Sequence, residues 1–367
     1  MMDPHHAKVR FGIIGGAGRR ARFFLRVAWA LPEQFEVVGA VVRDEAKAAE
    51  HRERWGVPTY PSVDAMLDAV DMAFVVVSVK RNSAPPVLHQ LADRDVPALC
   101  ETPPSDELER LVELHERTRH GARIQVAEQY PHQPMHAARL AMVDGGRLGR
   151  VSQAQVSAAH GYHGIALLRR LLNIGYEDVT IRASRFTSPI VARPRNAAPC
   201  QNVDDAETIR ESRQTLAYLD FGDRLGVYDF TGDQYTSWIR GPRVLVRGDR
   251  GEIINDDVKF LADARTPVEF ALRRIDAGHD GNLEGYHHKG VIGGETWLYR
   301  NAFVPGRLSD EELAVATCLA QMGRYAAGGN AFYPVAEAAQ DVYLAQLIEQ
   351  AVETGEAMCS DRQSWAQ

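Results

Sequence analysis

Histidine and tyrosine side chains gather in the segment AAHGYHGI, which spans Ala158–Ile165. His160, Tyr162 and His163 can all carry a proton, and histidine titrates near neutral pH. Removal of hydride from an alcohol carbon requires a base that takes the hydroxyl proton, and histidine suits that role. We therefore expect at least one of the three to be catalytic, with His163 as the general base. The alternative is that these side chains cap a helix or form structural hydrogen bonds.

Two further polar segments are candidates for substrate binding. Glu128 and Tyr130 lie in AEQYPHQP, directly after a predicted buried strand, where their side chains can bind substrate hydroxyl groups or pack as part of a linker. His287 lies in EGYHHKG and is expected to reach into the substrate pocket. Adjacent histidines point in different directions, and no carboxylates accompany them at metal-binding spacing. We therefore predict that the chain holds no metal.

A glycine cluster near the N-terminus, in FGIIGGAGRRARFFLRVA, has the order of a buried strand, a tight turn and a helix. In one register Gly15, Ala17 and Arg20 occupy the three glycine positions of a dinucleotide-binding turn. In the other, Gly16, Gly18 and Ala21 give the allowed form G-x-G-x-x-A. Both registers bring small residues and a helix N-terminus to a pyrophosphate. The predicted pyrophosphate-binding residues are Gly15, Gly16, Ala17, Gly18, Arg19 and Arg20, whose arginines would add charge-assisted contacts.

The end of the second predicted strand bears on the choice between NAD and NADP. Val42 occupies the position where an acidic residue would bind the adenosine ribose, and Arg43 and Asp44 follow. Arg43 would favour the 2′-phosphate of NADP, whereas Asp44 would favour NAD, so both cofactors stay open. Other predicted cofactor contacts follow the third and fourth strands, at Ser78, Val79, Lys80, Glu101 and Thr102.

Apolar runs alternate with helical patterns from residue 9 to about residue 127. The predicted strands are VRFGIIG, FEVVGAVV, MAFVVVSV, VPALCE and ARIQVAEQ. Continuous apolar strands between helices are typical of a doubly wound parallel sheet, which binds ligands at the carboxyl ends of its strands. Between the fourth and fifth strands, a helix with Ser105 as its N-cap is expected. Residues 1–127 are therefore predicted to form a Rossmann dinucleotide-binding domain.

Longer alternating runs dominate after residue 128, as in RVSQAQVSAAH and TLAYLDFGDRLGVYDFTG. This period indicates a mostly antiparallel, open sheet, with a hairpin turn at Gly222-Asp223. We expect residues 128–367 to form an α+β domain for substrate binding and oligomerisation, closed by a helix at about residues 334–355. The polar segment Pro194–Asp205 is expected to be a loop that covers a site.

Composition narrows the class of protein. The 367 residues carry a net charge of −7, which argues against a nucleic-acid partner. No apolar run is long enough for a membrane span, and the first ten residues do not resemble a signal peptide. The four cysteines are scattered without zinc or disulfide spacing, so a cytoplasmic location is expected.

Six landmarks occur in order along almost the whole chain: GIIGGAG, VVRDEAKA, CETPPS, AEQYPHQP, GGRLGRV and GYHGIALLRRLL. In their order and spacing the chain resembles the Gfo/Idh/MocA oxidoreductases. The resemblance implies a Rossmann domain followed by an α/β domain on a mostly antiparallel sheet. It also implies that NAD or NADP serves to oxidise or reduce a carbon of a sugar, an inositol or a related polyol.

Two departures from the family pattern bear on the chemistry. The family's Glu-Lys-Pro motif is Glu101-Thr102-Pro103 here, so the lysine expected near nicotinamide and substrate is missing. The family also tends to place an acid four residues before its catalytic histidine, and Ala159 stands at that distance from His163. His163 therefore lacks two companions that the resemblance implies for the catalytic histidine.

Three functions follow from these observations. The first is an NAD(P)-dependent dehydrogenase or reductase that acts on a sugar-like polyol or its keto form. The second is an enzyme with tightly bound NAD that oxidises a glycoside-like substrate transiently and eliminates or hydrolyses it, which the missing lysine favours. The third is a non-catalytic protein that senses a dinucleotide. Because the family's exposed sheet face often pairs subunits, a homodimer or homotetramer is expected, with no membrane partner.

Overall fold

The computed structural model describes residues 8–192, 207–277 and 286–366. The chain divides into two compact units. Unit one comprises Met1–Ala141, Leu272–Val342 and Gln363–Gln367, and unit two comprises Met142–Ala271 and Tyr343–Arg362. Within the described ranges, every helix is too short or too polar to cross a membrane.

Unit one is built on a six-stranded parallel sheet with the order β3-β2-β1-β4-β5-β6. Its strands are β1 (Val9–Ile14), β2 (Phe35–Val41), β3 (Thr59–Tyr60), β4 (Phe74–Val77), β5 (Ala98–Cys100) and β6 (Ile124–Val126). Its connecting helices are α1 (Ala21–Ala30), α2 (Glu45–Trp55), α3 (Val63–Ala69), α4 (Ala84–Asp93) and α5 (Leu108–Arg119). This order confirms the predicted doubly wound domain.

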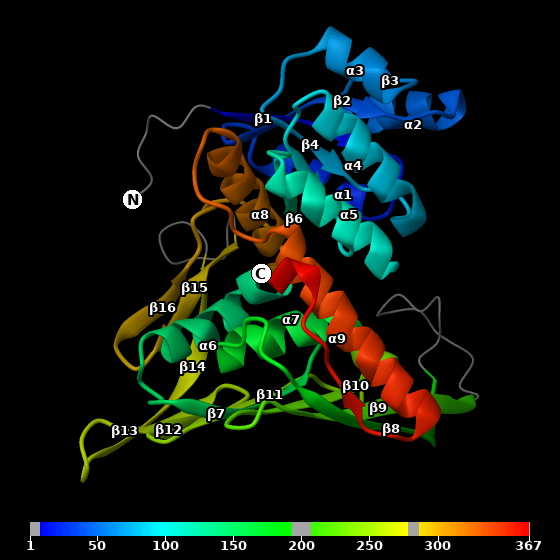
Figure 1. Cartoon of the computed structure of the whole chain (residues 1–367). Coiled ribbons are helices and arrows are strands. Elements are labelled where there is room, and N and C mark those ends of the chain that lie inside the picture. The colour runs from blue at the N-terminus through cyan, green and yellow to red at the C-terminus, as the bar shows by residue number, and fades with distance from the viewer. Residues whose placement is uncertain (1–7, 193–206, 278–285, 367) are drawn as a thin grey trace. The chain divides into compact units, whose positions relative to one another are not determined.

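The apolar strands of this sheet bury side chains on both faces. On β4, Phe74 and Val76 belong to a core that α1 covers, together with α8 (Asp310–Ala326). Val75 and Val77 point into a second core, which contains residues of α4 and α5. Figure 1 shows α4 and α5 in cyan over one face of the sheet. The strand is apolar throughout because successive residues alternate between two covered faces.

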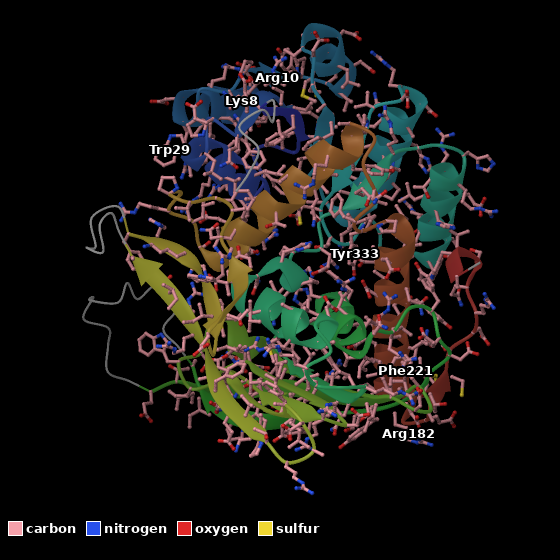
Figure 2. All side chains as sticks on the ribbon, turned by 90° about the vertical axis from the view of Figure 1, so that its left-hand side faces the viewer. Lys8, Arg10, Trp29, Arg182, Phe221 and Tyr333 are labelled. Atoms are coloured by element: carbon pink, nitrogen blue, oxygen red, sulfur yellow. The ribbon has the colours of Figure 1, made fainter. Side chains whose placement is uncertain are left out.

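The outer edge of β6 is covered by the segment that precedes α9. The Val126 amide donates to the Tyr333 carbonyl oxygen at 2.9 Å. Gln125 is buried, and its side-chain oxygen accepts from the amides of Phe332 and Tyr333, both at 2.9 Å. Tyr333, labelled in Figure 2, lies inside unit one. Backbone groups of the strand edge are thus paired rather than left open to another chain.

Residues suited to capping mark the ends of two helices, whereas the one predicted N-cap lies outside its helix. Ser62 caps α3, and the helix α2 stops at Gly56, whose φ of +66° suits glycine. The prediction that Ser105 is the N-cap of α5 is wrong, because α5 begins at Leu108 after Glu107. The Ser105 hydroxyl instead accepts from the Glu107 amide at 3.0 Å, in a turn that precedes the helix.

Unit two is built on a mostly antiparallel sheet, as predicted. Its strands follow the order β13-β12-β11-β7-β10-β9-β8-β17, and the β7–β10 pair is parallel. The bounds are β7 (Val151–Ser157), β8 (Thr180–Val191), β9 (Ile209–Asp220), β10 (Leu225–Thr231), β11 (Arg243–Gly248), β12 (Gly251–Ile254), β13 (Asp257–Leu261) and β17 (Met358–Cys359). Gly222, with a φ of +87°, lies in the predicted hairpin between β9 and β10.

The helix α7 (Gly161–Leu172) lies along one face of this sheet, as Figure 1 shows in green. A Cβ at Gly226 of β10 would lie 2.7 Å from Leu168 Cδ2, so glycine allows the helix to approach the strand closely. Three elements cross the boundary between the units: α6 (Pro134–Asp144), β14 (Pro267–Ala277) and α9 (Val335–Thr354).

The remaining elements are short. The strands β15 (His287–Gly293) and β16 (Thr296–Arg300) extend β14 within unit one. The 3-10 helices are η1 (Arg81–Ser83), η2 (Tyr130–His132), η3 (Gly232–Tyr235) and η5 (Ser364–Ala366).

Candidate functional site

The glycine turn joins the carboxyl end of β1 to the start of α1. Gly15 has a φ of +88°, and a Cβ there would lie 2.2 Å from the Ser78 carbonyl oxygen. Only glycine fits this position, because the turn passes against the end of the neighbouring strand β4. The Gly18 amide donates to the Gly15 carbonyl oxygen at 2.9 Å and tightens the turn. The turn therefore leaves the helix start uncovered by side chains at Gly15, Gly16 and Gly18.

Arg20, at the end of the turn, is held by carboxylates of unit one. Its Nε and Nη2 donate to the two oxygens of Glu101, both at 3.1 Å, and its Nη1 pairs with Glu311 of α8. Burial alone would lower the pKa of Arg20, but the charges of Glu101 and Glu311 raise it above its usual range. The guanidinium therefore ties the glycine turn to β5 and α8.

The segment after β2 places the candidate ribose-binding residues at the same edge of the sheet. Val42 is buried, whereas Arg43 and Asp44 are exposed. The Asp44 carboxylate accepts from the Lys47 amide at 2.9 Å and caps α2. This carboxylate thus already has a structural partner.

The predicted contacts that follow β4 and β5 lie along that edge as well. Ser78 is buried, and its amide donates to the Ile14 carbonyl oxygen at 2.9 Å. Val79 is half-buried and packs against the apolar core beside β4, whereas Lys80 is exposed. Thr102 follows Glu101 and is half-buried.

Glu128, directly after β6, is the most buried carboxyl group among the predicted site residues. It is 2 % exposed, and its Oε1 accepts from the Tyr130 amide at 3.1 Å. Burial raises the pKa of Glu128 to about 8, against weaker opposing effects of the Tyr130 amide and the Arg20 charge. The group therefore carries a proton at neutral pH and can donate a hydrogen bond.

Sequence reasoning missed two polar side chains on α6, one of which lies near the Tyr130 ring. The Tyr130 ring lies 6.4 Å from the ring of His136, and His136 Nδ1 lies 3.1 Å from Arg139 Nη1. Burial lowers the pKa of His136 to about 3, and the Arg139 charge lowers it further. His136 is therefore neutral at physiological pH. The i, i+3 spacing of this histidine and arginine was the available signal.

The proton-carrying residues of unit two do form a cluster. The His160 ring lies 5.4 Å from the Tyr162 ring and 5.0 Å from the His163 ring. Tyr162 and His163 are 4.4 Å apart. His163 is 5 % exposed, so its imidazole lies inside the protein.

The three residues belong to the start of a helix and not to the preceding strand. The strand β7 ends at Ser157, and His160 is the N-cap residue of α7, while Tyr162 and His163 lie in its first turn. Helical rather than strand geometry therefore brings the three rings together.

Tyrosines from β10 and η3 hold this cluster in place. The Tyr235 hydroxyl lies 2.8 Å from His160 Nδ1 and accepts from the His160 amide at 3.0 Å. The Tyr228 hydroxyl accepts from the Gly161 amide at 2.8 Å, and burial raises the pKa of Tyr228. A Cβ at Gly164 would lie 2.6 Å from the Tyr228 ring, so the helix and β10 are in close contact. Sequence reasoning missed both tyrosines, because their contacts with His160 and Gly161 join distant segments of the chain.

His287 lies on β15 in unit one and is 5 % exposed. The neighbouring His288 places Nδ1 2.6 Å from the Asp276 carboxylate. In the ranges that the structure describes, no group of three His, Cys, Asp or Glu side chains is arranged to hold a metal. The predicted covering loop Pro194–Asp205 lies outside the described residues.

Comparisons with known proteins identify the N-terminal region. Residues 9–128 match the family model described as "Oxidoreductase family, NAD-binding Rossmann fold". No curated protein matches the chain.

Solved structures share the fold at low sequence identity. Levoglucosan dehydrogenase in complex with NADH and levoglucosan aligns with a TM-score of 0.69 and 15% identity, over 97% of this chain and 100% of that one. A myo-inositol dehydrogenase from Corynebacterium glutamicum aligns with a TM-score of 0.64 and 16% identity, over 97% of this chain and 100% of that one. An oxidoreductase from Agrobacterium radiobacter, in complex with NAD+, L-tartaric acid and magnesium, aligns with a TM-score of 0.65 and 14% identity, over 96% of this chain and 98% of that one. Residues 9–128 therefore match the NAD-binding Rossmann domain of an oxidoreductase family, and the chain shares the fold of these dehydrogenase structures over almost its whole length.

Proposed function

We propose that this oxidoreductase transfers hydride between a nicotinamide cofactor and a hydroxyl-bearing carbon of a sugar, inositol or related polyol, or its keto form. The observation that carries the proposal is the glycine turn at the carboxyl end of a parallel sheet. At Gly15 the backbone has a φ of +88° and leaves no room for a side chain. The levoglucosan and myo-inositol dehydrogenases that share the fold support the choice of substrate class.

The chain's own residues fit a dinucleotide. The glycine turn leads into the start of α1, where Rossmann domains bind a pyrophosphate through backbone amides, and its glycines would let the phosphate approach the backbone. We propose contacts at Gly15, Gly16, Ala17, Gly18, Arg19, Arg20, Arg43, Asp44, Ser78, Val79, Lys80, Glu101 and Thr102. When bound, the nicotinamide supplies the hydride acceptor or donor.

Proton transfer is assigned to unit two. We propose that the His163 imidazole takes the hydroxyl proton of the substrate during oxidation and returns it during reduction. His160 and Tyr162 position the His163 ring, since all three rings are in mutual contact. Glu128, Tyr130 and His287 of unit one are proposed to bind substrate hydroxyl groups. In this proposal residues 1–127 bind the cofactor, and residues 128–367 bind the substrate.

The substitution His163→Ala tests this assignment. The variant should lose about two to four orders of magnitude in kcat, because general-base catalysis contributes that much. Its dissociation constant for the cofactor should stay within about twofold of the wild-type value, since His163 belongs to unit two. Initial rates with a panel of polyols and calorimetric titration of the cofactor measure the two effects. An unchanged kcat would remove His163 from the mechanism.

Thr102 favours a second candidate function. Without a lysine at this position, the acid–base groups can serve a reaction in which bound NAD oxidises a glycoside-like substrate transiently and is regenerated after elimination or hydrolysis. Purified protein that retains NAD and turns over a glycoside without net consumption of cofactor would support this candidate. A protein that binds a dinucleotide but shows no sugar-dependent change in nicotinamide absorbance would instead be a sensor.

We also propose that the open face of the unit-two sheet pairs subunits into a homodimer or homotetramer in the cytoplasm. Apolar side chains on this face include Tyr218 at 56 %, Phe186 at 46 % and Ile254 at 42 % exposure. Monomeric behaviour in size-exclusion chromatography would contradict this proposal.

A further inference from the structure

A groove of about 180 Å³ lies beside the glycine turn, between the start of α1 and one face of α2. Gly16 and Ala17 form its rim on the turn. Its charged lining consists of Arg22, Lys47, Arg54 and Glu50, so the groove carries two net positive charges. Within the described part of the chain, the three cations of the groove form no ion pair. The groove therefore offers its positive charge to a ligand.

His51 lies in this groove with no hydrogen-bond partner. The residue is 3 % exposed, and neither ring nitrogen is paired within the described ranges. A Cβ at Gly16 would lie 3.1 Å from His51 Nε2, so the imidazole faces the glycine turn. Buried polar atoms in folded proteins are almost always paired, and an orphaned imidazole facing a basic groove indicates a missing acceptor.

The end of β2 lacks the acid that would select NAD. A Rossmann domain specific for NAD holds the ribose hydroxyl with a carboxylate at this place, whereas a basic residue there accommodates the 2′-phosphate of NADP. Here Val42 is buried, and the nearby Asp44 carboxylate caps α2 through the Lys47 amide. The Asp44 carboxylate is thus engaged in a helix cap, and the Lys47 side chain lines the groove.

We propose that the protein prefers NADP(H) and that Arg22, Lys47, Arg54 and His51 bind its 2′-phosphate in this groove. The inference rests on the proposed function, because the adenosine end of a dinucleotide on the glycine turn must extend toward β2. A doubly charged phosphate has oxygens enough for several charge-assisted hydrogen bonds. The Arg54 guanidinium is already fixed over the Trp55 ring at 5.2 Å, which reduces the entropy lost on binding. His51 Nε2 would supply a neutral donor from the floor of the groove.

Titration of the full chain with NADPH and with NADH tests this inference without requiring a substrate. Wild-type protein should bind NADPH at least about tenfold more tightly than NADH. The double variant Arg22→Ala/Lys47→Ala should lose about ten- to a hundredfold in affinity for NADPH and less than about twofold for NADH. The matched control is Arg52→Ala on the same helix, because Arg52 pairs with Glu45 outside the groove. This control should leave both affinities unchanged.

The imidazole resonances of His51, assigned with the variant His51→Gln, provide a second readout. They should shift on addition of either dinucleotide, because His51 faces the glycine turn, and should shift further with NADPH than with NADH. Equal or tighter binding of NADH by the wild-type protein would overturn the inference and leave the proposed function standing. Failure of both dinucleotides to bind would overturn the proposed function itself. Equal losses for NADPH and NADH in the double variant would assign the groove to the shared part of the cofactor and contradict a 2′-phosphate site.

Discussion

Glu128 combines burial with a titratable side chain. Its folded-state pKa of about 8 exceeds the unfolded value of 4.5, so the folded protein binds the proton more tightly. The resulting stabilisation is fully present below about pH 4.5 and is lost as the pH rises through about 8. The size of the shift corresponds to an upper limit of about 5 kcal/mol.

The substitution Glu128→Gln should remove this pH dependence. The variant keeps the oxygen that accepts from the Tyr130 amide but has no proton to lose. Its melting temperature should match that of the wild-type protein near pH 5 and exceed it by several degrees near pH 9. Thermal melts at a series of pH values measure the effect. The exposed Glu113→Gln is the matched control and should follow the wild-type profile, and a variant profile parallel to the wild type would contradict the burial argument.

The sequence predicts which side chains lie together where local helix geometry decides their positions. It does not predict their partners from distant segments. The histidine and tyrosine of GYH on α7 lie together because helical spacing brings neighbours onto adjoining faces. Arg20 was expected to contact phosphate, but its guanidinium also meets Glu101 and Glu311, which lie far away in the sequence. Its role in cofactor binding stays a prediction. No local pattern reveals a partner that only the folded sheet and α8 bring near.

Among the elements, the glycine turn constrains the cofactor site most strongly. In Gly15→Ala the added methyl group would meet the Ser78 carbonyl oxygen at 2.2 Å and force a strained φ. The turn must shift, which moves the amides at the start of α1. We therefore expect the variant to lose at least about a hundredfold in cofactor affinity, because misplaced amides forfeit their charge-assisted bonds.

Calorimetric titration with NADPH and NADH measures this loss. Gly121→Ala is the matched control, since Gly121 has a φ of +98° but a Cβ there would meet nothing within 4 Å. That variant should be slightly less stable and should bind the cofactor as the wild-type protein does. Normal binding by Gly15→Ala would show that the turn does not hold the pyrophosphate.

At this scale the sequence predicts the parallel sheet well, because apolar strands and capped helices carry strong local signals. The two-residue strand β3 has no such signal and was not expected. The strands β13 to β16 were also not predicted individually, since short strands in an open sheet depend on their partners for definition.

For the whole molecule, the chain passes between its two units more than once. The chain leaves unit one after Ala141 and returns to it at Leu272. It enters unit two again at Tyr343, within α9. Such exchanges depend on contacts between distant segments, so sequence patterns do not reveal them. The domain boundary expected at residues 127 and 128 remains a prediction.

Direct titration of the intact protein with NADPH and NADH, by calorimetry and without substrate, tests the central claim that the glycine turn holds a dinucleotide. The account predicts saturable binding of one dinucleotide per chain, with NADPH the tighter ligand and the heat abolished in Gly15→Ala. The absence of binding heat for both dinucleotides, or binding that Gly15→Ala leaves intact, would contradict it.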